Sequence, residues 1–484
     1  MNWSSFLFKN QSLRQTILKN TFWLTVANVA SRAIRALLVI YAARTLGVAG
    51  FGVFSYALGF AAFIIGLSEI GITGILNRDI ARQTGQEEKI ISTSFFIKMT
   101  LSAITYAAIL FAAFYFVAIP AAVSVIPIIG IALLLDGLRE FCFGIVRAFQ
   151  KMETEAFVTI VSQIASVALG LMIIIIWPTP LALAVAYAIG SFLAAIFILY
   201  RLKNYFQNLK ANFDRSLVKK ILRDSWPFGF ISLGNTLLLY TDTIFLGWMK
   251  TTVDVGLYSA AAKPIQIIGL IPNLFIIALF PTIARQIAVS GSAKSVIEKG
   301  FALMMLFAIP IAIGGFLLPE IAILPIFGQG YASAMPIFQL LIIMSIYNFP
   351  GAIFGYTLLA HNKQSKAIKY LLGSALLNMI LNYFFIQQFG VIGAALATVI
   401  SQAVSTLGPM IETWKLEKIS VLRYLWRPAI ATSGMSMFIL LMKLVGISYW
   451  VTFPFSVLIY AVILALLQEP FFKELVKLVL SRRK

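Results

Sequence analysis

The sequence predicts an all-α polytopic membrane protein with about fourteen transmembrane helices, and three observations lead to this fold class. Of the 484 residues, 60% are hydrophobic and 12% are charged, and the mean hydropathy of +0.93 is far above that of soluble proteins. Apolar runs of about 20 residues, long enough to cross roughly 30 Å of hydrocarbon as a helix, recur along the chain. Lysines and arginines gather in every second connection between these runs.

Each apolar run is expected to form one transmembrane helix, because a helix satisfies its backbone hydrogen bonds internally. The expected spans are residues 20–43, 52–76, 91–118, 123–148, 157–177, 181–200, 228–249, 257–284, 300–318, 335–360, 367–386, 390–411, 428–446 and 450–468.

The distribution of cations predicts the orientation. With the N-terminus inside, about 30 of the 38 lysines and arginines fall in cytoplasmic segments, and Arg44 and Lys250 are external. We therefore expect a multi-pass protein of the cell (cytoplasmic) membrane with both termini cytoplasmic. The net charge of +20 then reflects topology and contact with anionic membrane lipids, and it does not indicate nucleic-acid binding.

An internal repeat divides the chain into two lobes. The sequence at residues 17–21 resembles that at 221–225, and residues 52–57 resemble 256–261, with the same offset of 204 residues. Both copies start in the same direction across the membrane, so the repeat predicts two parallel, pseudo-symmetric six-helix lobes around a central cavity. The expected parts are the N-terminal lobe at 1–200, a basic amphipathic linker on the cytoplasmic membrane surface at 201–227, the C-terminal lobe at 228–412, and two further helices with a cytoplasmic tail at 413–484.

Several short motifs resemble those of a known family. They are Arg44–Gly47 and Gly52–Tyr56 after the first span, Leu279–Arg285 at the end of the eighth, and Phe389–Ala395 at the start of the twelfth. On these residues and the fourteen-helix plan, the chain resembles the oligosaccharide flippases of polysaccharide biosynthesis, whose superfamily includes lipid II flippases and multidrug and toxin exporters (MATE). The resemblance implies a MATE-like, alternating-access transporter that moves an undecaprenyl-pyrophosphate-linked oligosaccharide from the inner to the outer leaflet.

Two arginines near the middle of the first span are the strongest candidates for a substrate site. A cation near the bilayer centre costs at least about 2.5–3.5 kcal/mol, so it normally faces protein, water or an anionic ligand. Arg32 and Arg35 are three residues apart and share a helix face. Guanidinium groups match phosphate oxygens, so we expect this pair to receive the pyrophosphate or acidic sugars. The alternative is an internal ion pair with Asp242 or Glu69.

Three more cations lie within expected spans. Lys263 precedes a proline in the eighth span and is expected either in the cavity or snorkelling to the outer surface. Lys98 is expected to snorkel. Arg139 is a further substrate candidate, although Asp136 and Glu140 beside it also predict a local ion pair.

A second set of residues suggests an ion-coupling site in the C-terminal lobe. Asp242 lies midway along the seventh span, and the eleventh and twelfth spans carry Asn378, Asn382 and Thr398. Oxygen ligands of these types suit Na⁺. The resemblance to lipid II flippases adds the carbonyl of Ala394 and implies an aspartate where this chain has Asn382, so we expect weaker ion binding. Asp242 coupling to H⁺ is the alternative.

Other functions fit less well. Glu69 is expected either to balance a cation or to carry a proton. An exporter of cationic drugs with the same fold is the alternative function, followed by a lipid II flippase; the former needs a cavity dominated by carboxylates. We expect no enzyme activity, no cofactor and no metal beyond Na⁺, because nucleophile, nucleotide-loop and metal-cluster patterns are not found. We expect a monomer that works with the polysaccharide polymerase machinery.

Overall fold

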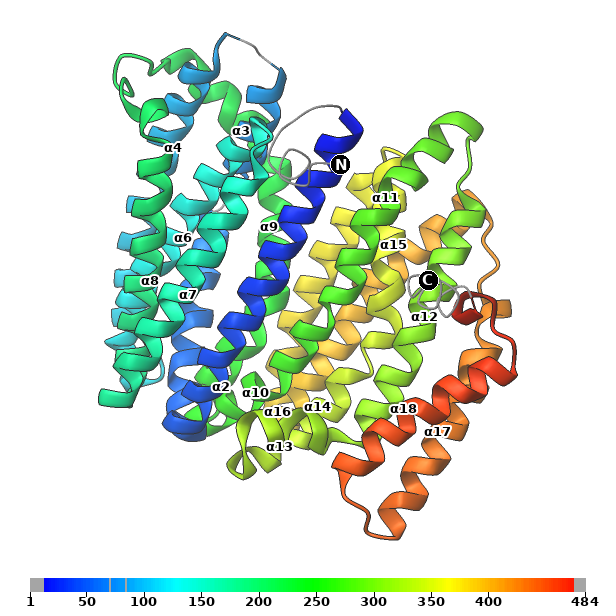
Figure 1. Cartoon of the computed structure of the whole chain (residues 1–484). Coiled ribbons are helices and arrows are strands. Elements are labelled where there is room, and N and C mark those ends of the chain that lie inside the picture. Colours follow the sequence, from blue (N-terminus) through cyan, green and yellow to red (C-terminus); the bar gives the residue numbers. More distant parts are fainter. Residues whose placement is uncertain (1–12, 69–70, 83–84, 474–484) are drawn as a thin grey trace. The chain divides into compact units, whose positions relative to one another are not determined.

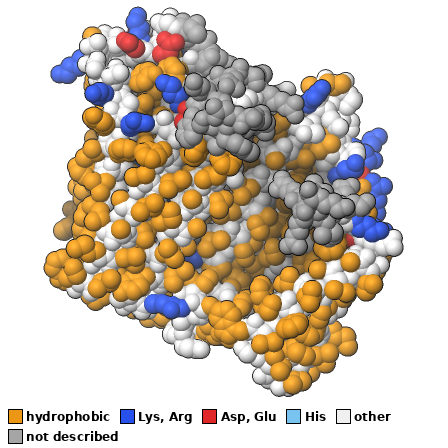
Figure 2. Space-filling view, in the orientation of Figure 1, with side chains coloured by type: hydrophobic (Ala, Val, Ile, Leu, Met, Phe, Trp, Pro, Cys, Tyr) orange, Lys and Arg blue, Asp and Glu red, His pale blue; other side chains and the backbone are white. Residues whose placement is uncertain are grey.

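The computed structural model describes residues 13–68, 71–82 and 85–473, and in this part of the chain helices are joined by short connections, with no β-strand (Figure 1). The predicted all-α membrane fold is confirmed. Within the described residues, ten helices are long and apolar enough to cross a membrane, or eleven if the bent pair at 329–360 is one span. Hydrophobic side chains dominate the face seen in Figure 2, as expected for a surface in contact with lipid.

The difference from fourteen spans has a structural cause. Two of the ten helices each contain two expected spans, joined at a glycine with a positive φ, Gly47 (φ 66°) and Gly390 (φ 59°). Only glycine adopts such a backbone without strain, so these residues bend the chain between two apolar runs. The expected span at 428–446 also forms a helix, but this helix is not among the ten.

The chain forms two compact units, Met1–Gly256 (the first unit) and Leu257–Lys484 (the second unit). The division falls within α10 (Thr252–Ile268), so α9 (Arg215–Met249), which the repeat places at the start of the second lobe, packs with the first unit. Compactness and repetition are different criteria, and the lobe boundaries inferred from the repeat stay a prediction.

The described residues of the first unit form eight α-helices before the division. They are α2 (Leu13–Ser68), α3 (Ile72–Arg82), α4 (Glu87–Tyr115), α5 (Pro120–Val123), α6 (Val125–Ala148), α7 (Met152–Ile176), α8 (Pro180–Arg201) and α9 (Arg215–Met249), with the 3-10 helix η1 (Lys203–Phe206) between the last two.

Small residues allow the helices of the first unit to approach closely. Leu38 of α2 packs against Val167 and Ile174 of α7 and Leu183 of α8. A Cβ atom on Gly170 would lie 2.8 Å from the Leu38 side chain, so this position leaves room for little more than a hydrogen atom. Close contact of this kind replaces the hydrophobic effect as the source of helix association in lipid. The contact between Leu38 and Gly170 fixes which face of α2 is buried.

The second unit contains the remaining helices. They are α10 (Thr252–Ile268), α11 (Leu270–Ser290), α12 (Lys294–Leu317), α13 (Pro319–Phe327), η2 (Gln329–Ala334), α14 (Met335–Ile342), α15 (Ser345–Ala360), α16 (Gln364–Glu417), η3 (Leu422–Tyr424), α17 (Trp426–Leu444) and α18 (Tyr449–Leu466).

The last two helices are attached to the second unit by ionic and hydrogen-bonded contacts. Glu298 of α12 is 3% exposed and accepts hydrogen bonds from the amide nitrogen of Ser420 and from Arg423 Nη2, each at 2.6 Å. The Tyr460 hydroxyl of α18 donates to the carbonyl oxygen of Leu306 at 2.7 Å. These contacts position α17 and α18 beside α12.

Candidate ligand and ion sites

Both candidate arginines are exposed on α2 in the first unit. Leu38, three residues after Arg35, is buried in the packing of α2 against α7 and α8. Arg35 Nε and Nη2 donate hydrogen bonds to Gln163 Oε1 of α7 at 3.3 and 3.1 Å. This contact engages two nitrogens of the Arg35 guanidinium group. Because the glutamine side chain is neutral, the positive charge of Arg35 stays uncompensated by this contact.

No ion pair links Arg32 or Arg35 to a carboxylate in the described parts of the chain. Asp242, one of the alternative partners, lies on α9 in the same unit and is 2% exposed. Glu69, the other alternative partner and a candidate ion-coupling residue, lies outside the described residues. The positive charges of Arg32 and Arg35 also repel each other. An anionic group between them would relieve this repulsion.

The third arginine, Arg139, is in a different situation. Its Nη1 lies 2.9 Å from Asp136 Oδ1, so the expected local ion pair is present. The Tyr187 hydroxyl of α8 donates to Asp136 Oδ2 at 2.6 Å, and it also interacts electrostatically with Arg35. Glu140 Oε1 instead lies 2.7 Å from Arg147 Nη1. The substrate role of Arg139 stays a prediction, with most of its charge already balanced by Asp136.

In the second unit, the candidate ion ligands of α16 come together. The bend at Gly390 brings the two halves of the helix together. As a result, Asn378 Nδ2 in the first half lies 3.2 Å from Ser401 Oγ in the second half. Asn382 Nδ2 donates to the Asn378 carbonyl oxygen at 2.9 Å. Thr398 Oγ1 donates to the carbonyl oxygen of Ala394 at 3.1 Å. Four of the predicted ligands are therefore in one cluster.

Sequence reasoning missed other members of this cluster. The hydroxyls of Tyr258 and Thr398 are 3.1 Å apart, and Ser374 Oγ donates to the Ser401 carbonyl oxygen at 2.5 Å. Ser401 is three residues after Thr398, a spacing that marks a polar helix face and was available in the sequence. Tyr258 could not be found this way, because it comes from α10. The amides and hydroxyls of the cluster are almost fully buried.

The other candidates lie elsewhere. Asp242 is in the first unit and Lys263 is in the second, where the half-buried Lys263 Nζ lies 3.4 Å from Gln266 Oε1 one turn further along α10. Lys98 on α4 is 9% exposed. Among the described residues, no group of three or more histidine, cysteine, aspartate or glutamate side chains is placed to hold a metal ion.

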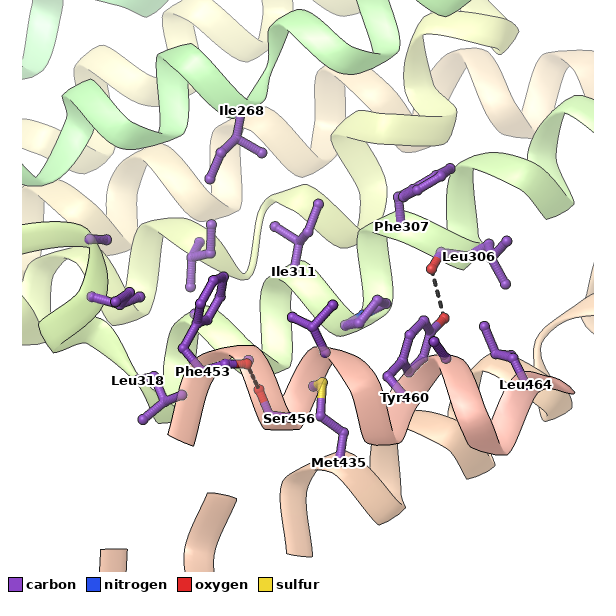
Figure 3. A pocket seen from close by; sticks show the side chains of 18 of the residues that line it. Ile268, Leu306, Phe307, Ile311, Leu318, Met435, Phe453, Ser456, Tyr460 and Leu464 are labelled. Atoms are coloured by element: carbon purple, nitrogen blue, oxygen red, sulfur yellow. Dashed lines mark hydrogen bonds between the residues drawn. The ribbon is translucent and has the colours of Figure 1, made fainter. Parts of the chain in front are cut away.

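The second unit also contains an apolar cavity of about 570 Å³, which the sequence did not reveal (Figure 3). It lies between α12, α17 and α18, and the side chains that line it include Ile268, Phe307, Ile311, Met435, Phe453 and Leu464. The two hydroxyls on its wall are bonded within the unit, Tyr460 to the Leu306 carbonyl and Ser456 to the Phe453 carbonyl, each at 2.7 Å (Figure 3). The lining therefore offers a ligand almost no polar group.

Comparisons with known proteins agree with this architecture. A family model described as polysaccharide biosynthesis protein matches residues 17–287. The chain is 22% identical over 398 residues to a Haloferax volcanii protein named probable low-salt glycan biosynthesis flippase Agl15, covering 81% of this chain and 82% of the relative. It is 25% identical over 411 residues to the probable flippase AglR of the same organism, with 81% and 82% covered.

Among solved structures, the chain is similar to the lipid II flippase MurJ in an inward closed conformation. The TM-score is 0.75 with 15% sequence identity, and the match covers 93% of this chain and 99% of the other. At this identity the likeness concerns the fold.

Proposed function

Because the chain belongs to the polysaccharide biosynthesis protein family, we propose that it is a membrane transporter that flips a lipid-linked oligosaccharide from the inner to the outer leaflet by alternating access. The names of its relatives and its membrane fold support transport, in place of an enzymatic reaction. The observation that carries the proposal is the pair of exposed arginines on a membrane-spanning helix, without a carboxylate partner in the described residues.

The chemistry of the substrate requires such a pair. A pyrophosphate is strongly hydrated and cannot enter hydrocarbon without replacing its water by other donors. Arg32 and Arg35 offer two planar forks of permanently charged donors, and charge-assisted hydrogen bonds contribute about 1.5–3 kcal/mol each. In the proposed mechanism these arginines receive the pyrophosphate, and Lys263 and Arg139 assist.

The lipid part of the substrate needs a different environment. A polyprenyl chain gains about 25 cal/mol per Å² of surface removed from water and makes no hydrogen bonds. The apolar cavity between α12, α17 and α18 satisfies both conditions. We assign part of the polyprenyl chain of the substrate to this cavity.

We further propose that an ion, Na⁺ or H⁺, drives the cycle. The α16 cluster of Asn378, Asn382, Ala394 and Thr398 supplies oxygen ligands for Na⁺, and Asp242 supplies the carboxylate that either binds Na⁺ or carries H⁺. The hydrogen bonds of Asn378 and Asn382 described above are donated by their amide nitrogens, so coordination of an ion by the amide oxygens leaves these bonds in place. Glu69 is the second proposed proton carrier.

We also propose a cellular setting for this transport. The protein acts as a monomer in the cell membrane, with both termini cytoplasmic, and delivers its substrate to a polysaccharide polymerase. The runner-up function, export of cationic drugs, lacks support in the described first unit, where the exposed ionic side chains of α2 within the membrane are arginines. Cations would be repelled there.

Reconstitution tests the function. The full chain is placed in liposomes with an undecaprenyl-pyrophosphate-linked oligosaccharide that carries a fluorophore, and a membrane-impermeant quencher measures transfer between leaflets. We expect Arg32→Gln with Arg35→Gln to lower the flipping rate at least about tenfold, because two charge-assisted contacts are lost. The control is Lys294→Gln with Lys299→Gln, which removes two exposed cations outside the site.

Two results would contradict the proposal. One is a wild-type protein that moves a cationic dye but not the lipid-linked oligosaccharide. The other is a double glutamine variant, folded as judged by its elution from a sizing column, that flips at the wild-type rate.

A further inference from the structure

The connection between α8 and α9 is fastened onto the start of α4. Ser92 donates a hydrogen bond to a backbone carbonyl of the connection, and the amide nitrogen of Asp214 donates to Thr93 Oγ1 at 3.0 Å. Asn212 Nδ2 donates to Glu88 Oε2 at 2.9 Å. Three side chains near the start of α4 therefore hold the connection, so its own side chains take defined positions.

An apolar groove of about 580 Å³ lies between α4 and this connection. Phe96 of α4 and Phe213 of the connection meet edge to face, with ring centroids 5.5 Å apart. Phe213 is 42% exposed and Leu222 is 39% exposed, although both lie outside the candidate membrane spans. The other lining residues are Ile97, Thr100, Leu101, Lys210 and Val218. Apolar surface of this kind, outside the spans, is suited to a ligand with an apolar part.

Cations border the groove on one side. A neighbouring cavity of about 780 Å³ shares Phe213, Val218 and Leu222 with the groove and adds three cations. These are Arg215, Lys219 and Arg223, which are four residues apart on α9 and so share one face. Together with Lys210, they place four positive charges beside an apolar surface.

Few acids balance these charges. Within the described residues, Lys210, Arg215 and Lys219 form no ion pair. Asp214 caps α9 and accepts hydrogen bonds from the amide nitrogen and the hydroxyl of Ser216 at 2.9 and 2.6 Å. These hydrogen bonds hold the pKa of the Asp214 carboxyl below its usual range. Arg223 lies 3.5 Å from Asp224, but because Asp214 is committed to its helix cap, the other three cations leave the border of the groove positive.

We propose that the groove binds one anionic phospholipid, with its phosphodiester on Lys210, Arg215 and Lys219 and one acyl chain along Phe96, Phe213 and Leu222. A soluble phosphate would make no use of the apolar lining. A zwitterionic lipid would bring a positive headgroup close to the cations. The site differs from the proposed substrate site, because it is formed by α4 and the start of α9 and not by α2.

Native mass spectrometry of the full chain in detergent tests this proposal. The probes are dioleoyl phosphatidylglycerol and dioleoyl phosphatidylcholine at equal concentration. We expect the wild type to retain one phosphatidylglycerol with a preference of about tenfold, because the choline group of phosphatidylcholine is repelled by the cations. Lys210→Gln with Arg215→Gln and Lys219→Gln is expected to remove the preference. Lys294→Gln with Lys299→Gln and Lys369→Gln, the same change in charge in the second unit, is expected to keep it.

A second variant tests the acyl-chain part. Thr100→Trp fills the groove and leaves every cation in place, so we expect it to lower phosphatidylglycerol retention about tenfold. Equal retention of both lipids by the wild type, or an unchanged preference in the triple glutamine variant, would overturn the proposal. Displacement of the lipid by an equal concentration of inorganic phosphate would also overturn it, since phosphate lacks the chain.

Discussion

The two units differ in the polar groups that they place within their membrane spans. In the first unit, Arg32 and Arg35 are charged and exposed, whereas in the second unit Asn378 and Asn382 are neutral and have no exposed surface. A charged, exposed side chain can bind a ligand as it stands. The two buried amides donate hydrogen bonds through their nitrogens within their own unit, and their oxygens are the atoms that suit a cation. The first unit therefore offers exposed positive charge to an anionic ligand, whereas the second offers buried, neutral oxygen atoms that suit a cation.

The largest effect should come from reversing the charge in the first unit. Arg32→Glu with Arg35→Glu replaces attraction of the pyrophosphate by repulsion, and we expect the flipping rate in liposomes to fall at least about 100-fold. Arg32→Lys with Arg35→Lys keeps the charge but loses the planar forks, so it should cost about tenfold or less. A glutamate variant that flips as well as the lysine variant would remove the distinction between the two units.

The next effect concerns Asp242, a buried carboxylate of the first unit. If Asp242 couples transport to an ion, Asp242→Asn should lower the ion-driven flipping rate about tenfold while leaving ion-independent exchange in place. The measurement is the flipping rate with and without an imposed Na⁺ or H⁺ gradient. Thr241→Ser, a change at the neighbouring residue, is the control. A variant that responds to the gradients as the wild type does would exclude the coupling role.

A change in the second unit should have a smaller, opposite effect. Asn382→Asp places a carboxylate in the α16 cluster, and an ion there would compensate its burial. We expect Na⁺, compared with choline, to raise the thermal unfolding midpoint of this variant by several degrees more than that of the wild type. Asn382→Leu, which supplies no ligand, should show no such gain. Destabilisation of the aspartate variant in both salts would indicate that the cluster serves packing alone.

The smallest effect is expected at Tyr187, whose hydroxyl bonds to Asp136 and not to a ligand site. Tyr187→Phe removes one hydrogen bond to a charged group, which contributes about 1.5–3 kcal/mol at most and often less between membrane helices. The thermal midpoint should fall by a few degrees while the flipping rate stays within about twofold. A loss of flipping as large as that of the double glutamine variant would place Tyr187 in the substrate site.

The sequence alone determined the membrane fold and the candidate arginines. Hydropathy is a property of consecutive residues, so the expected spans at 91–118 and 157–177 coincide closely with α4 and α7. A charge within an apolar run is visible for the same reason, which is why Arg32 and Arg35 could be singled out. The resemblance to flippases likewise rested on contiguous motifs, and the family is confirmed over residues 17–287.

Only the tertiary structure decided which side chains meet. Tyr187 reaches Asp136 across 51 residues, and Ser401 reaches Asn378 because the chain bends at Gly390. The apolar cavity and the apolar groove with its bordering cations also depend on which helix faces lie next to each other. In a chain that is apolar almost everywhere, the sequence pattern distinguishes spans from loops but not one neighbouring helix from another. Packing of small residues and a few hydrogen bonds make that choice.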